Sequence, residues 1–196
     1  MRYIKELREH FKNRVVFTIS DLKIFLKPKG ISRGYLHLLL HNLISKGEIK
    51  RITKGVYTFR DEIEVVGFAS EPFYYGLQEA LSLKNLWEQE TNPVVITPRK
   101  VRSGIKNFEG KNYVVKRINR KMFFGFEWFK YEDFWIPVSD AEKTLIDFIY
   151  FKESLDMETL KEIKRRLDEK RLRAYLKRSP KWVNKRVIDM LQDLNK

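Results

Sequence analysis

The sequence predicts an α+β fold in two parts: a helical first part that ends in a β-hairpin, and a mixed α/β second part that ends in helices. Apolar residues recur at helical spacing over the first 45 positions. Short β-branched runs, which are typical of strands, alternate with helical patterns from about residue 63. A length of 196 residues suits two small domains, which we expect over residues 1–62 and 63–196.

Two helices are predicted at the start of the chain. Apolar residues at the spacing of one helical face predict a helix over residues 3–11. The capping pattern from Thr18 to Asp21 opens a second helix. This helix must end at the segment Lys27 to Gly30, because Pro28 lacks the amide that a helix interior requires.

A third helix and a hairpin complete the first domain. Ser32 caps a helix that is expected to run to about Ser45. Residues 48–53 and 56–60 are predicted strands, joined by the turn Lys54-Gly55. Three helices followed by a two-stranded wing are typical of a winged helix-turn-helix, so we predict this DNA-binding fold for residues 1–62.

The third helix is predicted to present two different faces. Its buried face would consist of Leu36, Leu39, Leu40, Leu43 and Ile44. The opposite face is polar, nearly uncharged and carries a leucine and a tyrosine, which suits base edges and thymine methyl groups in a major groove. We therefore predict base contacts from Ser32, Arg33, Tyr35, His37, Leu38 and His41. Phosphate contacts are expected from the hairpin and its flank, by Lys50, Arg51, Lys54 and Arg60, and from the turn before the third helix, by Lys27 and Lys29.

The distribution of charge supports a polyanionic partner. The chain has a net charge of +14, with 14 basic and 6 acidic residues in positions 1–62 and 14 basic and 8 acidic residues in positions 151–196. The intervening segment is neutral, with 12 of each. Localised positive charge favours double-stranded DNA, because each neutralised phosphate releases condensed counterions. The alternative is a solvated lysine- and glutamate-rich surface, as found in heat-tolerant proteins.

Composition excludes several classes of site. Cysteine is absent, which excludes disulfides, thiolate zinc sites and cysteine nucleophiles. His37 and His41 have the spacing of two metal ligands on a helix, but only leucines lie between them and the chain has one further histidine, His10. We expect no metal and no cofactor. No apolar stretch approaches the ~20 residues of a membrane span, and no targeting segment is evident, so a cytoplasmic protein without a membrane partner is expected.

The second domain is predicted to combine one sheet with several helices. Expected strands cover residues 63–68, 93–97 and 113–118, and the aromatic run 122–138 is predicted to form a hairpin whose rings are core rather than a platform for single-stranded bases. Expected helices cover residues 73–87, a segment opened by a capping box from Ser139 to Glu142, and the chain after Asp156 and after Ser179-Pro180. The basic stretch 161–178 is interpreted as an amphipathic helix with a solvated face, and a second DNA or acidic-protein contact is the alternative.

No arrangement of residues points to catalysis. The chain lacks a Walker-type phosphate loop and a Gly-x-Ser-x-Gly elbow. The neighbouring acids Glu132 and Asp133 are interpreted as surface charges, Glu142 as the reciprocal cap partner of Ser139, and Asp147 as a helix surface residue. We therefore predict that the protein is not an enzyme.

Several segments together resemble the AbiEi-type antitoxin family of abortive-infection systems, which are transcriptional regulators. They are residues 32–36, 46–57, 75–81, 122–126 and 138–147. The resemblance implies a DNA-binding first domain that represses its own operon. It also implies a second domain that counteracts a nucleotidyltransferase-like toxin.

The predicted function is therefore that of a sequence-specific DNA-binding transcriptional regulator, the antitoxin of a toxin–antitoxin pair. Two alternatives remain open at this point. One is a nucleic-acid-processing enzyme that uses the winged helix only for docking, which would require a metal-binding carboxylate cluster around Asp133 or Asp147. The other is a protein-interaction adaptor whose winged helix no longer binds DNA.

Overall fold

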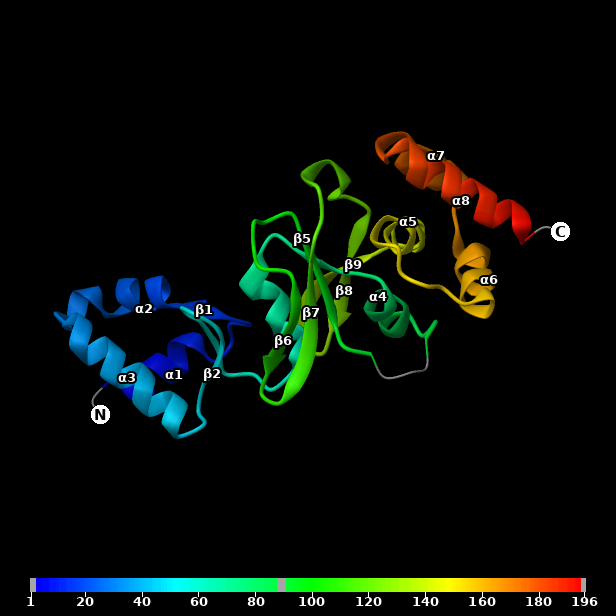
Figure 1. Cartoon of the computed structure of the whole chain (residues 1–196). Helices are drawn as coiled ribbons and strands as arrows, with labels where there is room; N and C mark the ends of the chain where they lie inside the picture. Colours follow the sequence, from blue (N-terminus) through cyan, green and yellow to red (C-terminus); the bar gives the residue numbers. More distant parts are fainter. Residues whose placement is uncertain (1–2, 88–90, 195–196) are drawn as a thin grey trace. The chain divides into compact units, whose positions relative to one another are not determined.

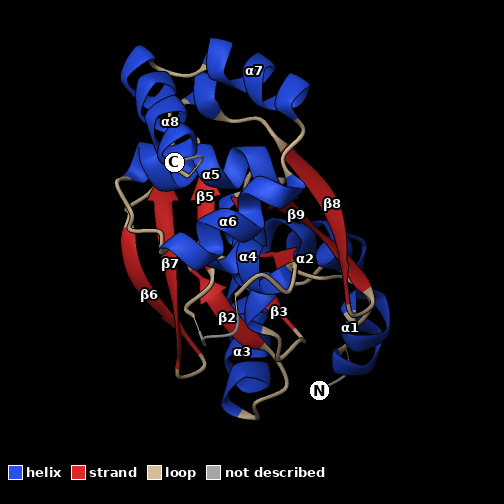
Figure 2. Ribbon diagram, turned by 90° about the vertical axis from the view of Figure 1, so that its right-hand side faces the viewer, coloured by secondary structure: helices blue, strands red, loops and turns tan. Residues whose placement is uncertain are grey.

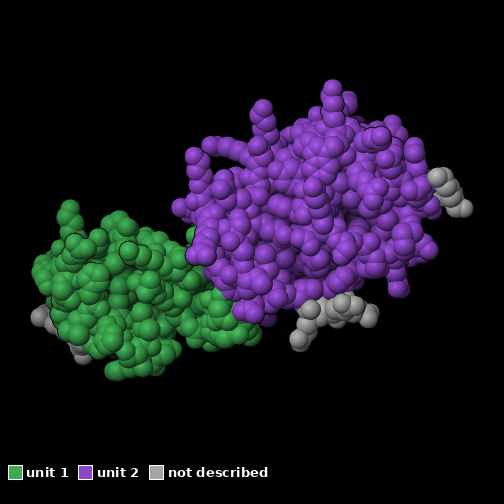
Figure 3. Space-filling view, in the orientation of Figure 1, with its two compact units in different colours: residues 1–71, 107–111 green, residues 72–106, 112–196 purple. Residues whose placement is uncertain are grey.

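The computed structural model describes residues 3–87 and 91–194, and the chain divides into two compact units (Figure 3). The first unit comprises residues 1–71 and 107–111, and the second comprises residues 72–106 and 112–196. Helices and strands occur in both units, so the predicted α+β class is confirmed. The units divide after Glu71, whereas the sequence places a domain boundary after residue 62, and independent folding of the two predicted domains stays a prediction.

The first unit contains three helices and a small sheet in the order expected from the sequence (Figure 1). Its elements are α1 (Ile4–Phe11), β1 (Phe17–Thr18), α2 (Ile19–Leu26), the 3-10 helix η1 (Lys27–Lys29), α3 (Arg33–Ser45), β2 (Lys50–Thr53), β3 (Val56–Thr58) and the 3-10 helix η2 (Ile63–Ser70). Strand β3 lies between β1 and β2, and both pairings are antiparallel.

Local sequence explains where α2 begins and why the chain turns after it. The Thr18 hydroxyl accepts a hydrogen bond from the Asp21 amide at 3.1 Å, and the Asp21 carboxylate accepts one from the Thr18 amide at 2.7 Å. This reciprocal capping box is the one predicted. After η1, Gly30 adopts a φ of +63°, a conformation that glycine reaches without strain, and the chain can then enter α3.

The apolar faces of the three helices meet in one core. Leu7, Phe11, Leu22, Leu39 and Leu43 are all fully buried there. Since burial of one such side chain contributes about 1.5–3 kcal/mol, this core fixes which side of each helix faces solvent.

The second unit is built on a six-stranded sheet of order β6-β7-β5-β4-β9-β8. The strands are β4 (Tyr74–Tyr75), β5 (Val94–Thr97), β6 (Gly104–Phe108), β7 (Lys111–Arg117), β8 (Phe126–Tyr131) and β9 (Phe134–Ser139). The pairings β4–β9 and β5–β7 are parallel, and β4–β5 and β8–β9 are antiparallel. The sheet is therefore mixed in strand direction.

Five helices gather on one face of this sheet (Figures 1 and 2). They are α4 (Gln78–Leu83), α5 (Ala141–Phe151), α6 (Met157–Arg166), α7 (Glu169–Arg178) and α8 (Lys181–Asp193), and a short 3-10 helix η3 (Arg120–Met122) precedes β8. Helix α5 contacts α6, α7 and α8 and shares a core with the sheet. No helix in the described ranges 3–87 and 91–194 is long and apolar enough to cross a membrane.

The strand predicted at residues 63–68 is wrong, because this segment forms η2. A short, buried apolar run cannot be assigned to strand or helix by periodicity alone. Strand β6 has no counterpart among the predicted strands. Its Ile105 is 72% exposed, so β6 lacks the apolar alternation that identifies a half-buried strand.

The single helix predicted over residues 73–87 is also wrong at its start. Tyr74 and Tyr75 pair with β5 and form β4, and α4 begins only at Gln78. Gly76 makes this close approach possible, because a Cβ atom at that position would lie 2.5 Å from the Ile96 Cδ1 atom. A helical prediction from the apolar spacing could not detect this contact between distant segments.

The predicted aromatic hairpin is confirmed as β8 and β9, but its rings are not all core. Phe124 and Phe134 are buried, whereas Trp128 is 66% exposed and Trp135 is 54% exposed. The register pairs Trp128 with Pro137 and Lys130 with Trp135, so both exposed tryptophans lie on the same face of the hairpin.

The C-terminal basic stretch is interrupted rather than continuous. Helix α6 ends at Arg166, Leu167 is extended, and the Asp168 carboxylate caps α7 by accepting from the Arg171 amide at 2.9 Å. The helix predicted to begin near Asp156 is confirmed as α6, which Asp156 caps, but Ser179 does not provide the cap predicted for α8. Its hydroxyl instead donates to the Tyr175 carbonyl at 3.0 Å.

Candidate nucleic-acid interface

Helix α3 has the orientation that the sequence predicts, with one correction. The Ser32 hydroxyl accepts a hydrogen bond from the Tyr35 amide at 3.2 Å and so starts the helix. The four predicted leucines at positions 36, 39, 40 and 43 are buried. Ile44 was predicted to be buried with them and is 39% exposed. It lies about 80° around the helix from Leu36, further than any of the other three leucines.

The opposite side of α3 is open to solvent. Arg33, His37, Leu38 and His41 are exposed, and Leu38 is 50% exposed. Within the described part of the chain, the side chains of Arg33, His37 and His41 have no hydrogen-bond or ion-pair partner. An exposed leucine between imidazoles, with a guanidinium at the helix tip, is a surface that can contact both methyl groups and acceptor atoms of bases.

Tyr35 is less accessible than predicted. It is half-buried against the core of the first unit, and its ring meets that of Tyr3 edge-on at 6.2 Å between centroids. Only part of its side chain therefore remains available for a contact outside the chain.

Of the two phosphate-binding residues predicted in the turn, Lys29 forms an ion pair with Glu6. The four predicted in the hairpin and its flank fall into two pairs. Arg51 and Lys54 are exposed and have no ion-pair partner among the described residues. Lys50 forms an ion pair with Asp61, and the Arg60 guanidinium lies 3.4 Å from the Glu62 carboxylate. The charges of Lys50 and Arg60 are thus already matched inside the first unit, which the sequence-based prediction did not include.

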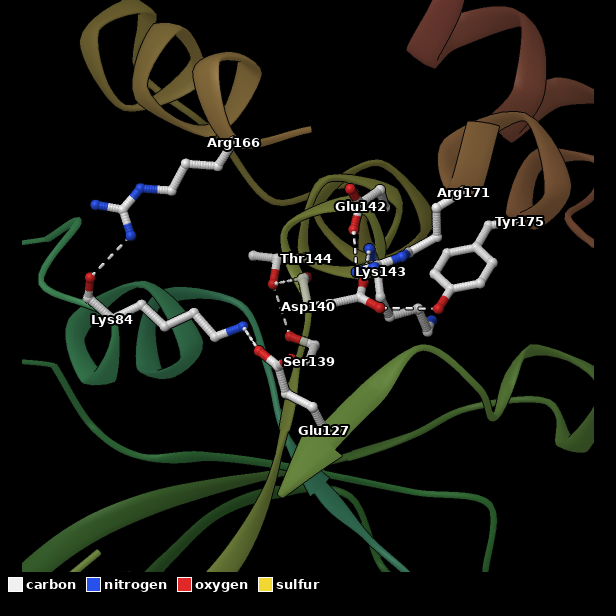
Figure 4. Close-up of polar contacts among 10 residues, drawn as sticks. All are labelled: Lys84, Glu127, Ser139, Asp140, Glu142, Lys143, Thr144, Arg166, Arg171 and Tyr175. Carbon is white, nitrogen blue, oxygen red and sulfur yellow. Dashed lines mark hydrogen bonds and ion pairs between the residues drawn. The ribbon is translucent and has the colours of Figure 1, made fainter. Parts of the chain in front are cut away.

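A second group of polar residues surrounds the start of α5 (Figure 4). Asp140, not Ser139, caps this helix by accepting from the Lys143 amide at 2.8 Å. The Ser139 hydroxyl instead lies 2.7 Å from the Thr144 hydroxyl. The predicted cap was therefore misplaced by one residue.

Glu142 is not the reciprocal cap partner that the sequence suggests. It is 1% exposed, accepts a hydrogen bond from the Asp168 amide at 2.5 Å, and lies 3.6 Å from the Arg171 guanidinium. Nearby, the Tyr175 hydroxyl donates to Asp140 at 2.8 Å. Burial, followed by this hydrogen bond, raises the pKa of Tyr175 to about 12. These contacts attach the start of α5 to α7.

Asp147 was predicted to lie on a helix surface and is fully buried. It forms an ion pair with Lys143, one helical turn away, and accepts a hydrogen bond from the Tyr74 hydroxyl at 2.8 Å. Burial raises the pKa of the Asp147 carboxyl, while the charge of Lys143 acts in the opposite direction. The i,i+4 spacing of lysine and aspartate was the one available signal, since apolar residues lie on every side of this helix.

The acidic residues thus have structural partners rather than the arrangement of a metal centre. No group of three histidine or acidic side chains that could hold a metal ion occurs in residues 3–87 and 91–194. Asp133 lies in the turn between β8 and β9, and Asp147 is enclosed with Lys143 and Tyr74. The carboxylate cluster that a metal-dependent nuclease would use is not formed around either residue.

Comparison with known proteins gives one family match, which lies within the first unit. Residues 5–60 match a family model described as a transcriptional regulator, AbiEi antitoxin. A search among curated proteins gave no match to the chain. The resemblance to this family is confirmed over the segment that contains α1 to β3.

Proposed function

Because residues 5–60 match the AbiEi antitoxin family of transcriptional regulators, we propose that this protein is a sequence-specific DNA-binding regulator and the antitoxin of a toxin–antitoxin pair. It binds double-stranded DNA through residues 1–62 and represses its own operon. Residues 63–196 counteract a nucleotidyltransferase-like toxin. Both activities take place in the cytoplasm and need neither a cofactor nor a membrane.

The proposed DNA-binding domain is a winged helix-turn-helix. Helix α2, η1 and α3 correspond to the helix-turn-helix, and β2 with β3 corresponds to the wing. The order α1-β1-α2-α3-β2-β3, with β1 paired to the last strand, supports this assignment. The observation that carries the proposal is the solvent-exposed, nearly uncharged face of α3.

Each predicted contact residue of α3, the hairpin and its flank has a place in this proposal. Base contacts come from the tip and exposed face of α3, that is Ser32, Arg33, His37, Leu38 and His41, with a smaller contribution from the half-buried Tyr35. Phosphate contacts come mainly from Arg51 and Lys54. To bind a phosphate, Lys50 and Arg60 would have to give up their ion pairs with Asp61 and Glu62. We therefore expect a smaller contribution to DNA affinity from these two residues.

Substitutions on α3 and in the wing are expected to have different effects on DNA binding. Arg33→Ala and His37→Ala should each weaken binding to the selected sequence by about 1–3 kcal/mol, with little effect on random duplex. Lys54→Ala should weaken binding to all duplexes and lower the salt slope by about 1. Affinities measured by fluorescence anisotropy at several salt concentrations provide the test.

Lys161→Ala serves as the matched control, because Lys161 is an exposed lysine on α6 in the second unit. Equal losses on specific and random DNA for all three substitutions would contradict the assignment of α3 to base contacts. Loss of specific binding in the Lys161→Ala variant would contradict the assignment of DNA binding to the first domain.

A further inference from the structure

The second unit contains a cleft between the C-terminal end of α5 and the exposed side of α8, two helices that contact each other. Its volume is about 700 Å³, within the range of about 300–1,000 Å³ that is typical of small-molecule sites. Apolar side chains dominate its wall, namely Phe148, Ile149, Leu155, Trp182 and Met190. The cleft is formed entirely by residues of the second unit.

Trp182 gives this cleft a flat aromatic wall. One side of its indole stacks on the Tyr150 ring, with an interplanar angle of 18° and 6.3 Å between centroids. The side chain nevertheless remains 48% exposed. A planar apolar group can therefore lie against the indole without any rearrangement of the core.

The rim of the cleft carries unmatched positive charge. Lys152, Lys185 and Arg186 are exposed, and in the described ranges 3–87 and 91–194 their side chains have no hydrogen-bond or ion-pair partner. Of the two acidic residues in the lining, Glu153 is held by Lys116 at 2.6 Å. The other acidic residue is Asp189, so the three positive charges of the rim face one negative charge.

The position of these groups on α8 brings an aromatic ring and cations together. Lys185 and Arg186 follow Trp182 by three and four residues, the spacings at which side chains are neighbours on a helix surface. At the end of α5, the carbonyls of Phe148 and Ile149 already accept hydrogen bonds from the amides of Glu153 and Lys152, at 2.9 and 3.1 Å. The floor thus presents apolar surface rather than unsatisfied carbonyls.

We propose that this cleft binds a small aromatic anion, a ligand with a planar apolar body and a phosphate or carboxylate group. The body lies against Trp182 and the apolar floor, and the anionic group is held by Lys185 and Arg186. Charge-assisted hydrogen bonds of this kind contribute enough to select an anion over a neutral molecule of the same shape. The domain that we propose to counteract the toxin would then also bind a small molecule.

Titration of the full chain with the fluorescent aromatic sulfonate 1-anilinonaphthalene-8-sulfonate tests this proposal. We expect one binding site per chain and an affinity that falls about tenfold in Arg186→Glu, since hydrogen bonds to charged groups contribute about 1.5–3 kcal/mol. Lys181→Glu changes the net charge equally but lies outside the lining, one helical turn from Lys185, so it should lower the affinity less than Arg186→Glu does. Trp182→Ala should also weaken binding about tenfold, because stacking is worth about 1–3 kcal/mol.

The neutral probe N-phenyl-1-naphthylamine has a similar aromatic body without the sulfonate, and it should bind at least about tenfold more weakly. Displacement of the sulfonate probe by AMP would assign a phosphate ligand, and displacement by salicylate a carboxylate ligand. Circular dichroism verifies that each variant is folded. If Trp182→Ala is not folded, Trp182→Phe is measured in its place. Absence of one-site binding, equal effects of Arg186→Glu and Lys181→Glu, or displacement by neither competitor would overturn the proposal.

Discussion

Replacement of Lys143 by methionine is expected to lower the free energy of unfolding of the second unit by about 3–5 kcal/mol. Lys143 and Asp147 are both fully buried, and the substitution leaves the Asp147 carboxylate with only the Tyr74 hydroxyl as a polar partner. Urea denaturation followed by tryptophan fluorescence measures the loss, because all four tryptophans of the chain, at positions 87, 128, 135 and 182, lie in this unit.

The pH dependence of the Lys143→Met variant provides an independent check. Burial raises the folded-state pKa of Asp147 above its ordinary value of 3.8, and removal of Lys143 takes away the charge that opposes this rise. A carboxyl whose pKa is raised by folding contributes stability below its unfolded pKa, and this contribution is lost as the pH rises through the folded pKa. The deficit of the variant should therefore be smallest below pH 3.8 and should grow toward neutral pH.

The double variant Lys143→Met/Asp147→Leu separates an unpaired charge from poor packing. Replacement of a buried ion pair by apolar groups of similar volume is often neutral or stabilising. The Tyr74 hydroxyl loses its acceptor in this variant, which costs about 1–3 kcal/mol, so only part of the lost stability should return. A double variant as unstable as Lys143→Met alone would show that packing around α5, rather than the buried charge of Asp147, determines the loss.

The second large effect is expected in α3. Leu39→Ala should destabilise the first unit by about 2–5 kcal/mol, because Leu39 is fully buried in the core that holds α1, α2 and α3 together. The matched variant Leu38→Ala removes the same number of atoms one residue earlier, where the side chain is 50% exposed, and should change stability by no more than about 0.5 kcal/mol. Amide hydrogen exchange of α1 to α3 is the suitable measurement, because the first unit contains no tryptophan.

The same pair of variants distinguishes stability from recognition. Leu38→Ala should weaken binding to the selected duplex although its stability is unchanged, whereas Leu39→Ala should act through loss of the folded helix. Similar exchange rates in the two variants would contradict the orientation of α3.

The three helices and the hairpin of the first unit could be predicted from the sequence, unlike η2, because their determinants are local. The capping box of Thr18 and Asp21, the Ser32 cap and the turn at Gly30 each depend on residues a few positions apart. The periodic leucines of α3 then fixed its buried side, apart from Ile44 at the margin. For this reason the exposed face of α3 could be predicted from the sequence.

The second unit was less predictable because its determinants are contacts between distant segments. Asp147 is buried by Tyr74, which is 73 residues away, and Glu142 binds the Asp168 amide, which is 26 residues away. Neither contact leaves a periodic pattern, so both acids resembled ordinary surface or capping residues. The same limit applies to the hairpin of β2 and β3, where the pairing of Lys50 with Asp61 depends on how the hairpin folds back.

The account depends on the exposed face of α3 entering the major groove, and site-specific photo-cross-linking tests this most directly. A p-benzoylphenylalanine side chain would replace Leu38, or Ile188 on α8 as an equally exposed control at 42%, and each protein would be irradiated with a duplex selected from a random library. We predict cross-links from position 38 to bases of the selected site and no cross-links from position 188. A tenfold excess of random duplex should not suppress the cross-links from position 38. Cross-links from position 188 but not from position 38, in a protein that still binds the duplex, would contradict the account.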